Sequence, residues 1–515
     1  MANTTALWKS LHIPRGEAVR SAPVVVALSH LRQCYGIPML RLACRRIRYV
    51  VAPSRLVRYL PVWIARTRTL LRLICRRGEG AGPIAAPVAA SVARLIASLI
   101  AGLMAGPTIA LAQEPPTQWV DPDTGHTVVR LSVEPGSSSL YFNYNGYTAD
   151  GTRLVFSTAH GISSVDLRTH KITPIVVGEV KLLFVGGHSS LVYYAKRDHD
   201  SGTAPLGAGV IYAADIATGK SKEVARIAHG SIGSINADES LLAGTAAERD
   251  MPVASGDRAR RNKDGKGLTY ADSKEVGLNE RLEARIPMEL FTVNLKTGER
   301  KVIHRATDWL NHVQFSPADP GLILFCHEGP WHKVDRIWTI RTDGTGLTRI
   351  HRRTMNMEIA GHEFFSPDGK TIWYDLQTPR GEDFWLAGYE IATGKRTWYH
   401  LQRDEWSVHF NISPDGRAFL GDGGDSEMVA HAKDGKWLYL FQPEAIDNVA
   451  GIGAADANEL IHPGILRAQR LVNLSKHQYK LEPNATFTPD GKWIVFRSNM
   501  HGGSQVYAVE VAKSR

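Results

Sequence analysis

Three histidines in the second half of the chain stand at or near the ends of apolar, strand-like runs. His327 follows the apolar residues 322–326, and His362 and His409 are each followed within seven residues by Ser-Pro-Asp-Gly. Side chains at such strand ends are presented by loops rather than buried. Converging neutral imidazoles suit a borderline transition metal such as Mn, Fe, Ni or Zn. The pattern predicts that the three histidines converge at a metal site.

Cys326 directly precedes His327 and raises the possibility of a thiol nucleophile. Its neighbours are apolar, which favours a small buried strand residue instead. The other cysteines, Cys34, Cys44 and Cys75, all lie in the first part of the chain. No disulfide can therefore form within residues 113–515.

The elements that would position these residues repeat along the chain. Turn signals such as Ser-Pro-Asp-Gly recur between β-rich runs, and hairpins are their usual context. They stand at residues 148–151, 186–188, 236–238, 316–319, 366–369, 413–416 and 488–491. Units of roughly forty to fifty residues with several short strands predict an all-β fold, a β-propeller, and seven signals predict seven blades. We expect residues 119–133 to pair beside residues 506–511 and close the ring, because open sheet edges would otherwise stay unpaired.

The net charge of +10 over 515 residues is unevenly distributed. Residues 1–112 hold sixteen Lys and Arg against two acidic residues, whereas the remainder holds 45 basic and 49 acidic residues. The body is thus mildly acidic, and the high overall charge gives no reason to expect nucleic-acid binding.

The basic leader resembles a targeting segment. Arginines precede the apolar residues 95–104, and Ala110-Leu111-Ala112 has the form of a cleavage site, so we predict cleavage after Ala112. A membrane anchor is the alternative, but the apolar stretch is short and is followed by Pro107. The long basic start also fits a start codon placed too far upstream. The prediction is a propeller of residues 113–515, periplasmic or secreted in a bacterium, without a stable membrane anchor.

Several stretches of the body resemble the oligogalacturonate lyases, a family of seven-bladed β-propeller polysaccharide lyases with a manganese-type site. The resemblance covers most of residues 115–515. It is carried by Trp-Leu-Asn-His at 309–312, Phe-Cys-His-Glu-Gly-Pro at 325–330, residues 334–338, His-Glu-Phe at 362–364 and Gly-Asp-Gly at 421–423.

The resemblance implies an exported lyase that cleaves acidic, uronate-containing oligosaccharides by β-elimination. By motif, His327 matches the catalytic base, and His362 and His409 match two ligands of a divalent metal, most often Mn. Removal of the proton at C5 builds charge on the neighbouring carboxylate, which a metal ion offsets. The product would carry a 4,5-double bond, and no water would be consumed.

Three positions depart from the family pattern. The family's glutamine ligand near the third histidine has no clear match, because Trp406 stands close to that place and Gln402 is only a weak substitute. Asn484 stands where the family has a further histidine ligand, and its carbonyl oxygen, or the carboxylate of Glu482, could bind a hard ion such as Mn. Glu289 stands where the family has an arginine for the substrate carboxylate. Arg285 or Arg281, a few residues earlier, is the expected replacement for this catalytic role.

Smaller expectations concern substrate binding. His312 and His501 stand at loop positions that resemble those of the family, and Trp331 is a candidate for stacking on a sugar ring. Two other functions stay open at this point. The missing ligand matches favour a non-catalytic periplasmic propeller for binding or scaffolding, and the same fold also supports metal-dependent hydrolases.

Overall fold

The computed structural model describes residues 116–196, 209–249, 267–268, 270–424, 432–447, 449 and 451–513. The chain divides into two units between Gln113 and Glu114, and all of these residues belong to the second. The predicted leader and its cleavage site lie outside the described residues. No helix within the described ranges is long and apolar enough to cross a membrane.

Antiparallel meanders make up the first part of the described chain. The strands of each sheet pair in chain order. A three-stranded sheet contains β3 (Arg153–Thr158), β4 (Gly161–Asp166) and β5 (Ile172–Val177). Three four-stranded sheets follow. The first contains β6 (Lys181–Val185), β7 (Leu191–Lys196), β8 (Gly209–Asp215) and β9 (Ser221–Ile227), and the second contains β10 (Ser231–Ile235), β11 (Leu241–Ala247), β12 (Met288–Asn294) and β13 (Arg300–Ala306). The third contains β14 (Trp309–Phe315), β15 (Leu322–Glu328), β16 (Ile337–Arg341) and β17 (Thr348–Arg349).

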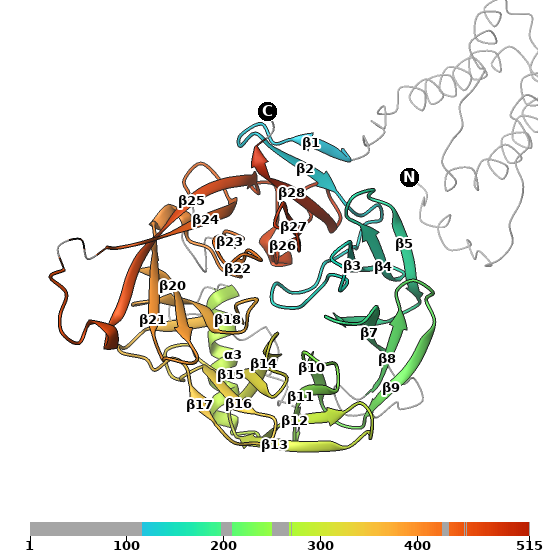
Figure 1. Ribbon diagram of the computed structural model, residues 1–515, viewed down its shortest axis with the longest axis horizontal. Helices are drawn as coiled ribbons and strands as arrows, with labels where there is room; N and C mark the ends of the chain where they lie inside the picture. Colours follow the sequence, from blue (N-terminus) through green and yellow to red (C-terminus); the bar gives the residue numbers. More distant parts are fainter. Residues whose placement is uncertain are drawn as a thin grey trace, which may run out of the picture. The chain divides into compact units, whose positions relative to one another are not determined.

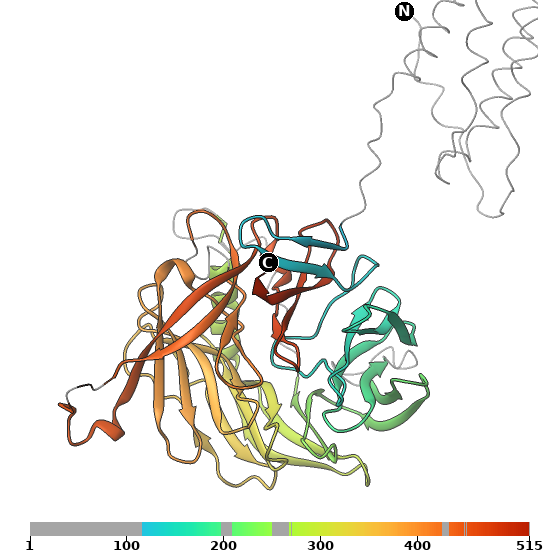
Figure 2. The same ribbon diagram turned by 45° about the horizontal axis from the view of Figure 1, so that its top comes forward.

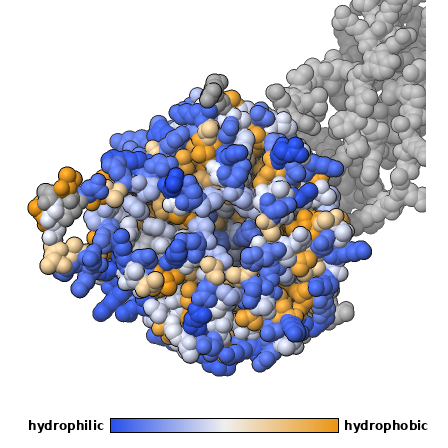
Figure 3. Space-filling view, viewed as in Figure 1, coloured by the Kyte–Doolittle hydropathy of each residue, from blue (hydrophilic) through white to orange (hydrophobic). Residues whose placement is uncertain are grey.

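The next sheet has eight strands in two antiparallel halves, which the parallel pair β21–β25 joins. The halves contain β18 (Ile359–Phe365), β19 (Thr371–Gln377), β20 (Phe384–Glu390) and β21 (Arg396–Leu401), and β22 (Asn411–Ile412), β23 (Phe419–Gly421), β24 (Trp437–Ala445) and β25 (Ile461–Asn473). Short 3-10 helices are η5 (Arg403–Glu405), η6 (Ala457–Glu459) and η7 (Tyr479–Leu481). The far end of the β24–β25 hairpin exposes Ile446, Val449 and Ile452, and apolar colour gathers there in Figure 3.

The last sheet contains strands from both ends of the described chain. Its order is β1 (Gln118–Val120), β2 (His126–Arg130), β28 (Gln505–Lys513), β27 (Trp493–Ser498) and β26 (Thr486–Phe487). In the antiparallel pair β2–β28, Val128 lies opposite Val509. The strand pairing expected between residues 119–133 and 506–511 is therefore present.

The sheets surround a common centre in an all-β, propeller-like arrangement (Figures 1 and 2). First strands such as β10, β14, β18, β22 and β26 lie nearest the centre, and last strands such as β9, β13 and β17 lie outermost (Figure 1). Apolar side chains pack between the faces of neighbouring sheets. One cluster, for example, joins Leu324 and Ile337 of one sheet to Ile372 and Tyr374 of the next.

The recurrent turn signals form the predicted hairpin turns. In residues 413–416, the Asp415 carboxylate accepts hydrogen bonds from the Ser413 hydroxyl at 2.6 Å and the Arg417 amide at 3.1 Å. Gly416 has a φ of 71°, a conformation that glycine adopts without steric cost. These local bonds explain why Ser, Asp and Gly recur at fixed offsets.

Two inserted segments reach the central region. Helix α3 (Tyr270–Ala284) lies in the long connection between β11 and β12. The segment between β2 and β3 runs into the centre (Figure 1). There the Phe142 amide donates to the Asn484 side-chain oxygen at 3.2 Å, and Asn411 donates to the Phe142 carbonyl at 3.3 Å. This segment is thereby tied to β22 and to a residue shortly before β26.

Candidate functional site

Four residues have similar, strained backbone conformations, two within the inner strands β14 and β18 and two shortly before β22 and β26. His312, His362, His409 and Asn484 have φ values of 49°, 49°, 50° and 48°. Strands β14 and β18 are bulged at these histidines. For an L-residue the left-handed region costs about 1–2 kcal/mol, and such strain clusters at functional sites. In β14 and β18 the bulge changes the direction of one side chain.

His362 and His409 form a pair of imidazoles whose ring centroids are 4.6 Å apart. The Nδ1 of His362 lies 2.8 Å from Asp375 Oδ1, and the Nδ1 of His409 lies 2.7 Å from Asp422 Oδ2. An ionised carboxylate only accepts hydrogen bonds, so each Nδ1 carries the proton and each Nε2 keeps its lone pair. Carboxylates hold metal-binding histidines in this manner.

Buried neighbours reinforce this orientation. Asp422 also accepts a hydrogen bond from the Tyr479 hydroxyl at 2.8 Å and from the Asn484 amide at 3.2 Å. Burial lowers the pKa of His409, but Asp422, Glu482 and Asp375 together outweigh it, so this pKa lies above its ordinary value of 6.5. The imidazole is therefore fixed in place by surrounding negative charge.

Glu482 and Asn484 face the histidine pair in different ways. Glu482 Oε2 lies 3.8 Å from His409 Nε2, and the Glu482 side chain is 41% exposed. The Asn484 oxygen already accepts the Phe142 amide, and its side-chain nitrogen donates to the Glu482 carbonyl at 3.2 Å. Of the two, Glu482 is the freer oxygen donor.

The chemistry of these donors suits a divalent cation, because two imidazole nitrogens and a carboxylate are common ligands of Mn, Fe and Zn. Within the described ranges, however, no three His, Cys, Asp or Glu side chains are gathered closely enough to hold a metal ion by themselves. A third ligand would come from movement of Glu482 or from a bound molecule.

His312 contributes a third imidazole from β14. Its Nε2 lies 3.0 Å from Glu328 Oε2, and Arg336 donates to the other Glu328 oxygen at 3.0 Å. Burial lowers the pKa of His312, but the hydrogen bond that His312 donates to Glu328 and the charges of Glu363 and Glu328 outweigh it, so the pKa lies above 6.5. The His312 ring lies 6.3 Å from the ring of Tyr141, which in turn lies 5.5 Å from the ring of His409.

A cavity of about 100 Å³ is lined by many of these groups, though not by His409 or Asn484. Among the residues that line it are Tyr141, Lys274, His312, Glu328, Trp331, Arg336, His362, Asp375, Arg380 and Glu482. Its small volume leaves room for only part of an oligosaccharide, because ligand pockets usually measure about 300 Å³ or more.

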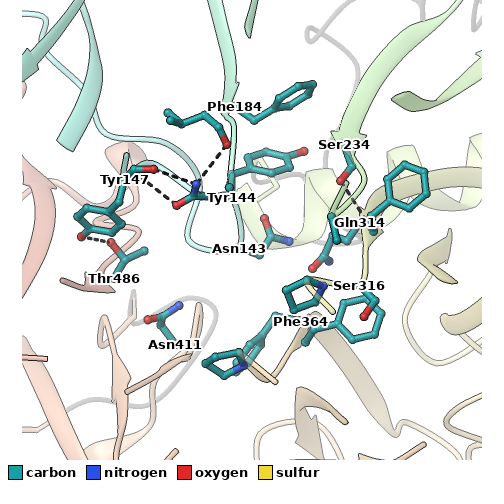
Figure 4. A pocket seen from close by; sticks show the side chains of 18 of the residues that line it. Asn143, Tyr144, Tyr147, Phe184, Ser234, Gln314, Ser316, Phe364, Asn411 and Thr486 are labelled. Atoms are coloured by element: carbon teal, nitrogen blue, oxygen red, sulfur yellow. Dashed lines mark hydrogen bonds between the residues drawn. The ribbon is translucent and has the colours of Figure 1, made fainter. Parts of the chain in front are cut away.

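The central segment after β2 separates this cavity from a larger one. Tyr141 lines the small cavity, whereas Asn143 and Tyr144 line a second cavity of about 470 Å³ (Figure 4). The second cavity is surrounded by side chains of the inner strands and their turns, including Gln314 and Asn411, and none of its lining residues is Lys, Arg, Asp or Glu. It lacks the charged groups of the small cavity.

The structure does not bring His327 to the other histidines, so the prediction of three converging histidines is wrong in this respect. The His327 Nδ1 lies 3.1 Å from Asp308 Oδ2, and its ring lies 5.3 Å from that of Trp338. Successive side chains of a strand point to opposite faces, and Glu328, the next residue of β15, lines the cavity instead.

Arg285, the other predicted catalytic residue, lies beside His327. Its Nη1 is 3.1 Å from Asp308 Oδ1, and its side chain is 64% exposed. Arg281 lies over the Trp309 ring at 4.4 Å. Neither arginine lines the cavity.

Of the three residues predicted to contact substrate, two line the cavity and one does not. His312 and Trp331 line the cavity. His501 does not; it packs edge-on against Trp119 at 5.3 Å, and its Nδ1 lies 3.1 Å from the Tyr507 hydroxyl.

One sequence pattern distinguishes the four residues with positive φ from His327. His312, His362, His409 and Asn484 each stand four residues before the Ser-Pro or Thr-Pro of a turn, whereas His327 does not.

Comparisons with known proteins assign the family. A family model for oligogalacturonate lyases matches residues 115–515. An oligogalacturonide lyase of Pectobacterium atrosepticum is 24% identical over 413 residues, covering 76% of this chain and 95% of that protein. An oligogalacturonate lyase of Dickeya dadantii is 27% identical over 232 residues, which cover 44% of this chain and 56% of that protein. A solved structure of oligogalacturonate lyase in complex with manganese aligns with a TM-score of 0.58 and 25% identity, over 77% of this chain and 96% of that one. The chain therefore belongs to the oligogalacturonate lyase family.

Proposed function

We propose that this pectin-degrading lyase cleaves oligogalacturonate by metal-assisted β-elimination at the small cavity. The observation that carries the proposal is the small cavity, which His312 lines together with His362, one member of the His362–His409 pair. Membership of a lyase family favours turnover over the non-catalytic propeller. The related structure that contains manganese supports Mn as the metal.

The ligands that we assign are His362, His409 and Glu482. Their Nε2 atoms and carboxylate fit a borderline divalent cation, and Asp375 and Asp422 keep the two imidazoles in the required tautomer. Glu482 would move toward the pair. A divalent cation bound there supplies positive charge opposite the substrate carboxylate, where negative charge develops during proton removal.

His312 is the residue that we assign as the base, in place of His327. It lines the cavity, and Glu328 fixes one of its nitrogens at 3.0 Å. The imidazole takes the C5 proton, the electron pair forms the C4–C5 double bond, and the C4–oxygen bond breaks. The proton ultimately passes to the departing oxygen, so the product is 4,5-unsaturated and no water is consumed.

Absorbance of the unsaturated product provides the test. We expect digalacturonate to give a signal that Mn²⁺ supports and a chelator removes, and that His312→Ala and His362→Ala lower by at least about 10²-fold, as for loss of a general base. His327→Ala is the matched control, because this histidine contacts Asp308 and does not line the cavity. A His312→Ala enzyme with normal activity, or a signal lost only in His327→Ala, would contradict the assignment. A hydrolase would release sugar without absorbance.

We also propose the finer architecture and the location. If each half of the eight-stranded sheet is one blade and every other sheet is one blade, the blades number seven. The pairing of β2 with β28 would then close the ring. The leader supports export to the periplasm or beyond the cell. Sequencing the N-terminus of the protein from a bacterial periplasmic fraction tests this: a start at Gln113 supports cleavage after Ala112, and an intact leader contradicts it.

A further inference from the structure

Helix α3 is anchored next to the mouth of the small cavity. Its Glu275 accepts a hydrogen bond from Arg380 at 3.0 Å and lies 3.2 Å from His332 Nδ1. Its Asn279 accepts one from Lys333 at 2.5 Å. These contacts join the helix to the connection after β15 and the connection after β19. Helix α3, which is inserted between β11 and β12, thereby becomes part of this site.

The cavity has three lining residues with permanently cationic side chains, and they differ in their partners. Arg336 is committed to Glu328, and Arg380 is committed to Glu275. Lys274, from the first half of α3, has no ion pair within the part of the chain that the structure describes. Its Nζ lies 5.5 Å from the centroid of the Trp331 ring. Lys274 is exposed, so its charge is available to a ligand at the mouth.

We propose that Lys274 and Trp331 form a subsite for a second uronate, the sugar next to the one that loses its proton. This inference rests on the proposed function and adds to it the recognition of a neighbouring acidic sugar. Lys274 is a specificity-determining residue, and α3 is the element that supplies it.

The shape of the site requires such a second contact. A cavity of about 100 Å³ cannot enclose an oligosaccharide, so the rest of the substrate lies over the mouth. An indole ring offers a broad apolar face for the C–H side of a sugar. Every sugar of oligogalacturonate carries a carboxylate, and an ammonium group beside the indole can pair with it.

The test combines two enzymes with two substrates. The substrates are digalacturonate and its derivative with a methyl ester on the non-reacting sugar only. The enzymes are the wild type and Lys274→Met, which keeps an apolar stem over Trp331 and removes the charge. We expect the ester to raise the wild-type KM about tenfold, from the loss of one charge-assisted contact, with little change in kcat. In Lys274→Met both substrates should share this higher KM.

Two further variants make the result specific. Lys274→Arg should recover most of the affinity for digalacturonate, because the positive charge returns. Lys296→Met removes a lysine from an exposed turn that does not line the cavity, and it should behave as the wild type.

The outcomes separate this inference from the proposed function. If wild-type enzyme turns over digalacturonate and Lys274→Met has an unchanged KM, or still discriminates against the ester by the same factor, the subsite assignment is wrong and the lyase function stands. If the wild type produces no unsaturated product, both fail together. A shared fall in kcat without a change in KM would indicate a folding defect rather than recognition, and it too would overturn the assignment.

Discussion

The buried ion pair between Glu328 and Arg336 allows a quantitative test of the site's architecture. Their side chains are only 6% and 4% exposed, and Arg336 Nη1 lies 3.0 Å from Glu328 Oε1. Glu328→Gln keeps the side-chain shape and removes the negative charge. Breaking a buried pair by removing one partner costs about 3–5 kcal/mol, because the other charge stays buried without compensation.

The expected loss lies near the lower end of this range, at about 3 kcal/mol. Burial lowers the pKa of Arg336, but the surrounding groups Cys326, Glu328 and Glu363 outweigh it, and the pKa stays above its ordinary value. Glu363 therefore keeps part of the compensating charge after the substitution.

Urea unfolding at neutral pH, followed by tryptophan fluorescence, measures this loss. Glu289→Gln is the matched control. Glu289 pairs with two arginines, Arg300 at 2.9 Å and Arg305 at 2.6 Å, but its side chain is 30% exposed. Exposed pairs contribute about 0.2–1 kcal/mol each, so this variant should lose about 1 kcal/mol. The two free energies of unfolding can be compared if the dependence of each on urea concentration has the same slope as in the wild type.

The reasoning is refuted if Glu328→Gln unfolds within 1 kcal/mol of the wild type, or if Glu289→Gln is the more damaging change. Either result would mean that burial does not set the energy of these ion pairs.

Three other predictions concern the site. The base must be neutral, and the pKa of His312 lies above 6.5, so kcat/KM should rise with pH in a step centred above pH 6.5. Glu328→Gln should move this step to lower pH. A step that does not move would exclude His312 as the titrating group. Asp422→Asn removes the negative charge of the group that accepts the His409 Nδ1 proton. The change should weaken Mn²⁺ binding about 10- to 100-fold in calorimetric titration, whereas Asp415→Asn in a surface turn should not; equal affinities would contradict the assigned ligands. Burial raises the pKa of the Cys326 thiol well above its ordinary value, so mass spectrometry should find its peptide alkylated by iodoacetamide only after unfolding, and rapid labelling of the native protein would contradict the buried position.

Repeated turns made the strands and the propeller-like arrangement predictable, because the hydrogen bonds of a Ser-Pro-Asp-Gly turn are local. The site was less predictable. His327 and Glu328 are adjacent, and which of them enters the cavity depends on the register of β14 against β15, where a bulge intervenes. The positive φ of His312 is likewise imposed by tertiary structure. The docking of helix α3 depends on ion pairs with loops distant in sequence, such as Glu275 with Arg380, which no local pattern reveals.

The pairing of β2 with β28 has a consequence for biosynthesis. Strand β28 lies between β2 and β27, so it provides hydrogen-bond partners for both. A nascent chain that has not yet reached residue 505 holds β2 with one edge unpaired, however much of the body has already left the ribosome. Contacts so distant in sequence form slowly, and unpaired edges promote aggregation. Premature termination, even close to the end, should therefore produce chains that chaperones and proteases remove rather than a shortened enzyme.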